Sequence, residues 1–112
     1  STHLKTIKKL ILGENIKYSG WFSGVNNLEN LTIEGTIGQD GFSVKDSPKL
    51  NKASITSIIN ALSTTTSGLT VTLSLSAVNN AFETSSGAAD GITSAEWKTL
   101  TDTKPNWTIA YA

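Results

Sequence analysis

The residues best suited to acid–base chemistry in this 112-residue chain are nine carboxylates and one histidine. Glycoside hydrolysis needs two carboxyl groups in one cleft, and serine-based hydrolysis needs a base beside the nucleophile. Most of the carboxylates are spaced as turn or helix-cap residues, and His3 precedes every periodic element. We therefore expect no catalytic residues and no enzymatic activity.

Metal and cofactor motifs are equally sparse. The chain has no cysteine, and its single histidine excludes a site built on a histidine pair. Asp90-Gly91 lies in a serine-rich stretch that lacks the alternating Asp and Asn ligands of a calcium loop. Residues 35–38 (Gly-Thr-Ile-Gly) lack the Lys-Ser/Thr of a phosphate-binding loop. We expect neither a metal nor a cofactor.

Binding chemistry is better represented, first by an aromatic pair. Trp21 and Phe22 are adjacent, and two neighbouring side chains of an extended segment point to opposite faces. One of the two is therefore expected to be exposed, as an anchor for a protein or sugar ligand. The alternative is that Trp21 packs against a neighbouring structural repeat.

Hydroxyl side chains form the second binding feature, since 30 of the 112 residues are Ser or Thr. Many alternate with apolar residues and are expected on one outward sheet face, where short hydroxyls make adaptable hydrogen bonds. The predicted face comprises Lys9, Ile11, Asn30, Thr32, Glu34, Thr70, Thr72, Ser74 and Thr108. The predicted binding residues are Trp21, Asn30, Thr32, Glu34, Thr70 and Thr72.

The charge balance narrows the partners. Nine basic and nine acidic residues give zero net charge, which argues against nucleic acid as a ligand. The longest apolar stretch is far shorter than a bilayer, so no membrane insertion is expected. A protein partner is favoured, a glycan is the alternative, and the chain itself is expected to be a monomer or to self-associate weakly.

The element that must position these residues is a repeat. Ile7, Leu10 and Leu12 form an apolar-x-x-Leu-x-apolar frame. The frame recurs at Leu28, Leu31 and Ile33 and again at Leu50, Ala53 and Ile55, with a Phe between consecutive frames. A 21- to 22-residue period predicts stacked coils, because one coil cannot bury its apolar face alone.

The second half of the chain changes period. Apolar spacing predicts a helix over residues 55–62 with Ser54 as N-cap, then a strand over residues 69–75. A second helix follows, capped by Ser74 or Ser76, then a loop over residues 84–92 and a third helix begun by a capping box on Thr93. Trp107, Ile109 and Tyr111 predict a closing strand, with Trp97 and Trp107 in the core.

The frame at residues 28–50 and the segments 54–62, 68–74 and 104–108 resemble the C-terminal repeats and cap of BspA-like leucine-rich repeat proteins. The resemblance implies an α/β solenoid fragment in one domain, residues 1–112, with strand coils over 1–53 and a helix-strand-helix-helix-strand cap over 54–112. It implies a bacterial surface or secreted adhesion module, extracellular and part of a larger chain. The alternatives are a structural cap, a phage-derived structural module or a carbohydrate-binding domain.

Overall fold

The structure is a computed structural model that describes residues 3–82 and 94–112. Within these residues two small parallel sheets and three helices form one α/β domain with extents of 35 × 34 × 19 Å. The predicted loop over residues 84–92, with Asp90, lies outside the described residues, as does Thr93. The capping box predicted on Thr93 was wrong, because Ser94 is the N-cap of the third helix and its hydroxyl accepts the Trp97 N–H at 3.2 Å.

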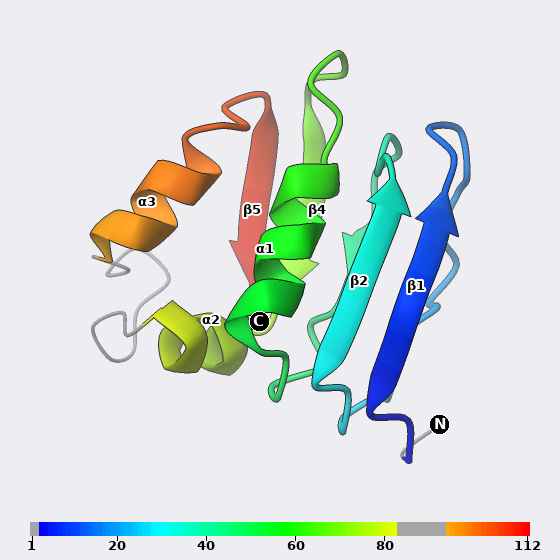
Figure 1. The fold of residues 1–112 in the computed structure, drawn as a ribbon. Coiled ribbons are helices and arrows are strands. Elements are labelled where there is room, and N and C mark those ends of the chain that lie inside the picture. Colours follow the sequence, from blue (N-terminus) through cyan, green and yellow to red (C-terminus); the bar gives the residue numbers. More distant parts are fainter. Residues whose placement is uncertain (1–2, 83–93) are drawn as a thin grey trace.

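The front layer in Figure 1 begins with strands β1 (Thr6–Leu12) and β2 (Asn30–Gly35), which pair in parallel. Helix α1 (Lys52–Ala61) lies beside β2, and helix α3 (Ala95–Thr101) follows on the far side of α1. Ile7 lies opposite Leu31 and Leu10 opposite Ile33, so β1 carries one extra residue between these pairs. The bulge leaves Lys8 and Lys9 exposed on the edge of the sheet.

The back layer is the second sheet. Strands β3 (Phe42–Ser43), β4 (Leu69–Leu73) and β5 (Trp107–Tyr111) pair in parallel, in that order. Helix α2 (Leu75–Phe82) follows β4. The closing strand is confirmed, whereas the strand predicted to reach Leu75 ends at Leu73, because Ser74 accepts a hydrogen bond from the Ala77 N–H and begins α2.

Residues about one sequence repeat apart touch each other directly. Ser47 Oγ donates to the Val25 carbonyl at 2.6 Å, and Lys49 Nζ donates to Asn27 Oδ1 at 2.7 Å. Each pair is separated by 22 positions, the period found in the sequence. The repeat therefore corresponds to consecutive turns of chain that lie one beside the next.

The core lies between the two layers. Phe22 and Phe42 are buried, as the repeat predicts, and Trp97 and Trp107 are buried as well. The side chains with less than 2% exposure are Phe42, Leu28, Leu31, Ile37, Ile55, Ile58, Ile59, Leu62, Leu73, Val44, Val71 and Val78. They come from both halves of the chain, so the repeats and the C-terminal elements share one core.

The third frame departs from its prediction. Ala53 is exposed, because a helix that starts at Lys52 replaces the third strand. The predicted N-cap was also wrong, because the N-cap is Asn51, whose Oδ1 accepts the Ser54 N–H at 2.9 Å in the first turn of α1. Ser54 is instead turned towards β2, where its hydroxyl accepts the Leu31 N–H at 2.8 Å.

Candidate functional site: a groove beside Trp21

A groove of about 540 Å³ lies between the turn at residues 20–23 and strands β3 and β4. The two sides of the groove are neighbours because Phe22 of this turn packs against Phe42 of β3, with ring centroids 5.7 Å apart, and β3 pairs with β4. The lining residues are Tyr18, Gly20, Trp21, Phe22, Ser23, Gly41, Phe42, Ser43, Lys45, Asp46, Thr72 and Ala112.

Trp21 forms the aromatic wall of the groove. Its side chain is 41% exposed while Phe22 is buried, which confirms that one member of the pair faces outward. Tyr18 meets Trp21 edge-on, with ring centroids 5.1 Å apart and planes at 85°. Tyr18 makes a second perpendicular contact with the core residue Phe42, also at 5.1 Å. Trp21 is thus held against the core through Tyr18, and burial raises the pKa of the Tyr18 phenol.

The floor of the groove consists of short hydroxyl side chains. Ser43 on β3 and Thr72 on β4 are register partners in the parallel ladder, and both are half-buried. The Ser43 hydroxyl accepts the backbone N–H of Lys45 at 3.3 Å, so its own hydrogen remains to be donated elsewhere. Small hydroxyl residues on adjacent strands give a shallow surface able to exchange hydrogen bonds with a ligand.

A carboxylate holds the turn that carries Trp21. Asp46 Oδ2 accepts the backbone N–H of Gly24 at 3.1 Å, across one repeat of 22 residues. Gly24 has a φ of 71°, a conformation that glycine adopts without steric cost. The charged group of Asp46 therefore positions the wall of the groove, and Lys45 stands beside it as an exposed cation.

The structure brings together some of the predicted binding residues and separates others. Trp21 and Thr72 line the same groove, and Thr70 lies two residues before Thr72 on β4. Thr32 and Glu34 belong to the other sheet. The prediction of one outward face is wrong, because its members are divided between two sheets in separate layers (Figure 1). Ser74 is buried as the cap of α2.

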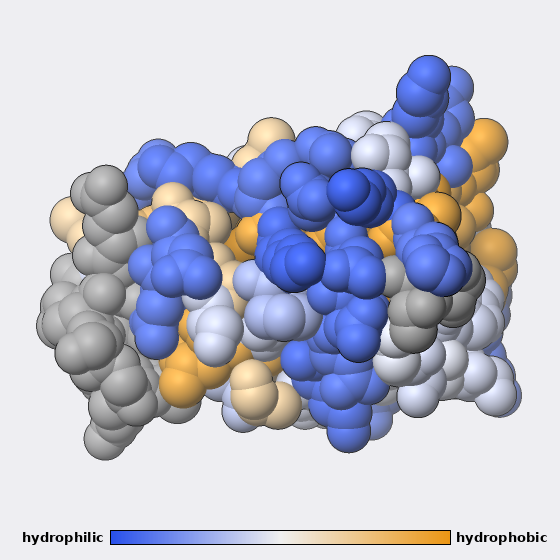
Figure 2. Space-filling model, turned by 90° about the horizontal axis from the view of Figure 1, so that it is seen from below, coloured by the Kyte–Doolittle hydropathy of each residue, from blue (hydrophilic) through white to orange (hydrophobic). Residues whose placement is uncertain are grey.

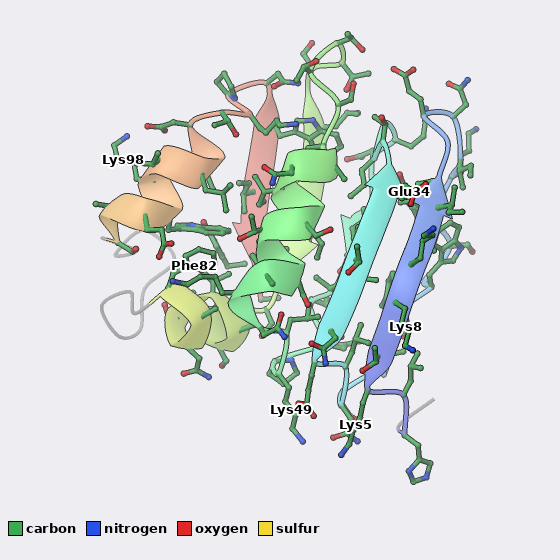
Figure 3. The ribbon with its side chains drawn as sticks, in the orientation of Figure 1. Lys5, Lys8, Glu34, Lys49, Phe82 and Lys98 are labelled. Atoms are coloured by element: carbon green, nitrogen blue, oxygen red, sulfur yellow. The ribbon has the colours of Figure 1, made fainter. Side chains whose placement is uncertain are left out.

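The predicted residues of β2 form a polar face of their own. Asn30 accepts from Asn51 Nδ2 at 2.7 Å and donates to Thr6 Oγ1 at 3.3 Å, so the amide bridges three turns of chain. Glu34 forms an exposed ion pair with Lys9 at 3.4 Å. Figure 3 shows Glu34 on the upper part of β2 and Lys8 on β1. Asn30 and Glu34 are therefore bonded to side chains of neighbouring segments.

Of the twelve residues that line the groove, the predicted binding residues include Trp21 and Thr72. The residues that sequence reasoning missed include Tyr18, Ser43, Lys45 and Asp46. Asp46 had a usable signal, since it follows Gly24 by one repeat, and residues one repeat apart are neighbours in stacked turns. Tyr18 had none, because its contact with Phe42 joins two distant segments at positions that the apolar frame does not cover.

No group of three or more His, Asp or Glu side chains that could hold a metal occurs in the part of the chain that the structure describes. In residues 3–82 and 94–112 no helix is long and apolar enough to cross a membrane. Comparison with protein-family models, curated proteins and solved structures found no match.

Proposed function

We propose that the chain is a non-enzymatic interaction module that binds a protein ligand in the groove beside Trp21. The observation that carries the proposal is that Trp21 and Thr72, 51 positions apart, line one groove. An exposed tryptophan fixed from behind supplies contact area at little entropic cost, and adjacent hydroxyls supply adaptable hydrogen bonds. Zero net charge disfavours nucleic acid as the partner.

The proposed architecture is the C-terminal end of a BspA-like leucine-rich repeat solenoid, in a larger bacterial protein outside the cell. Two features support it: the parallel pairing of β1 with β2, and hydrogen bonds such as Ser47 to Val25 across one repeat. Three large apolar side chains among the described residues are exposed, and all of them precede β2: Ile11, Ile16 and Trp21. Figure 2 shows apolar surface on the β1 side of the molecule, where a further coil would stack.

A second candidate is a structural cap that ends a stack, and one observation favours it. Helix α1 covers the edge of β2, with Ser54 and Ser57 accepting the Leu31 and Ile33 N–H groups, each at 2.8 Å. An uncovered edge is a template for unwanted pairing, so covering it keeps a stack soluble. The two candidates are compatible, because the groove lies away from this helix.

The test of the binding function starts from a library of random peptides displayed on phage and selected on the wild-type chain. Enriched peptides are expected to lose binding to Trp21→Ala and to Thr72→Lys, which fills the floor. Thr32→Lys is the matched control, since it makes the same change on β2 in the other layer. Enriched peptides that bind all four proteins equally would overturn the proposed site.

The solenoid is tested by duplication. A second copy of residues 6–29 placed before Thr6 should add one coil against β1. Each added interface stabilises a repeat protein, so the melting temperature should rise, and acrylamide should quench the original Trp21 less. The stacking proposal would be contradicted if the melting temperature stayed unchanged and proteases removed the inserted segment.

A further inference from the structure

We infer that the segment bound in the groove beside Trp21 is a proline-rich peptide in the extended polyproline II conformation. The inference rests on the proposed function and adds the chemical class of the ligand.

The aromatic wall has the shape that a proline ring requires. Tyr18 and Trp21 stand at 85° with centroids 5.1 Å apart, and both line the groove. Two perpendicular rings make an apolar corner that accommodates a compact, rigid ring. Proline-rich segments dock into grooves lined by aromatic side chains in this manner.

The floor offers a ligand little sheet edge, because β3, the outer strand of its sheet, is two residues long. The carbonyl of Thr72 accepts the Val44 N–H at 2.9 Å, and the Thr70 carbonyl accepts the Gly41 N–H at 3.3 Å. The backbone between β3 and β4 is therefore paired within the sheet, and a ligand over the floor meets side chains. A peptide that adds as a strand needs free backbone groups, whereas a polyproline II segment needs no ladder.

The groove is rich in hydrogen-bond donors. The indole N–H of Trp21, the ammonium of Lys45 and the hydroxyls of Ser43 and Thr72 can all donate. The carboxylate in the lining, that of Asp46, already accepts the Gly24 N–H. A proline-rich chain has the complementary surface, since its carbonyls accept and its prolines have no N–H to satisfy.

The probe for this inference is a proline decamer with blocked ends, titrated against the full chain. Trp97 and Trp107 are 3% and 7% exposed, so acrylamide quenching reports mainly on Trp21. The decamer should protect Trp21 from acrylamide. Trp21→Ala should weaken binding of the decamer by about tenfold or more, as removal of an aromatic anchor does. Calorimetry measures this affinity. Thr72→Lys should also weaken it, and Thr32→Lys should leave it within about twofold.

Two further probes separate this inference from the proposed function. A Gly-Ser peptide of equal length should not bind, and cellohexaose should not protect Trp21. Peptides from the random library that need Trp21 but contain no proline would overturn the proline assignment and leave the binding function standing. Protection by cellohexaose alone would overturn both in favour of a carbohydrate ligand, and library peptides that ignore Trp21 would also overturn both.

Discussion

The hydroxyl of Ser54 on α1 accepts the backbone N–H of Leu31 on β2 at 2.8 Å, and both residues are buried. One turn later the hydroxyl of Ser57 accepts the Ile33 N–H at the same distance. A helix cannot continue a strand ladder with its own backbone, so two serines three positions apart supply the acceptors that a third strand would have provided.

Ser54→Ala should lower the free energy of unfolding by about 1–3 kcal/mol, because it leaves the buried Leu31 N–H without an acceptor. Urea denaturation followed by circular dichroism measures the change. Ser76→Ala, an exposed serine on α2, is the matched control and should stay within about 0.5 kcal/mol of wild type. Equal stabilities for the two variants would contradict a role for Ser54 in covering the edge of β2.

Gly35→Ala should be the most disruptive glycine substitution in the repeats. A Cβ at Gly35 would lie 2.0 Å from the Leu12 carbonyl oxygen, and its φ is 103°. Gly41 is the matched control, since its φ of 90° is similar but no atom lies within 4 Å of an added Cβ. Gly41→Ala should lower the free energy of unfolding by about 1–2 kcal/mol because of backbone strain, and Gly35→Ala should lower it clearly more. Similar melting temperatures for both variants would refute the close approach of β1 to β2.

Lys104→Met should destabilise the fold by about 1–3 kcal/mol at neutral pH. The buried ammonium donates to the carbonyls of Asn60 and Leu62 at the C-terminal end of α1, and these carbonyls lose their donor in the variant. Lys98→Met removes an exposed lysine from an ion pair with Asp102 and should change little. A loss from Lys98→Met as large as that from Lys104→Met would argue against the helix-end contact.

The stability that Lys104 contributes should depend on pH. Burial lowers the pKa of Lys104 from 10.5, so the unfolded chain binds this proton more tightly than the folded chain. Its contribution to the free energy of unfolding therefore rises with pH between the folded pKa and 10.5. The free energy of unfolding of Lys104→Met, measured by chemical denaturation across this pH range, should lack that rise. Parallel pH profiles for the variant and the wild type would contradict a contribution from Lys104.

The two tyrosines should titrate late. Burial raises the pKa of Tyr18 and of Tyr111 above 10.0, although Tyr111 also accepts the Trp97 indole N–H at 2.9 Å. The folded state thus holds both protons more tightly than the unfolded state. The stabilisation is complete below pH 10 and is lost as pH rises through the folded pKa values. Phenolate absorbance should show midpoints above 10 in the folded protein, with Tyr18→Phe and Tyr111→Phe assigning them. A midpoint at 10 before unfolding would contradict the burial of that phenol.

Much of this protein follows from the sequence alone. The alternation in residues 31–33 and 107–111 predicts β2 and β5, and the 21- to 22-residue period predicts which residues become neighbours. The adjacency of Trp21 and Phe22 predicts one exposed aromatic side chain. These features depend on the spacing of apolar and polar residues along the chain, which is fixed by the sequence before any tertiary contact forms.

Only the tertiary structure decides how the repeats end and where the groove forms. The third frame has the same apolar spacing as the first two, and its Leu50 and Ile55 are buried. Between these two residues, however, the chain begins helix α1, and Ser54 of this helix bonds to β2. The predicted binding residues divide between two sheets because β2 pairs with β1 in one sheet while β4 pairs with β3 and β5 in the other. Trp21 and Thr72 line one groove because the turn at residues 20–23 and strand β4 both lie beside β3, an arrangement that no local pattern in the sequence contains.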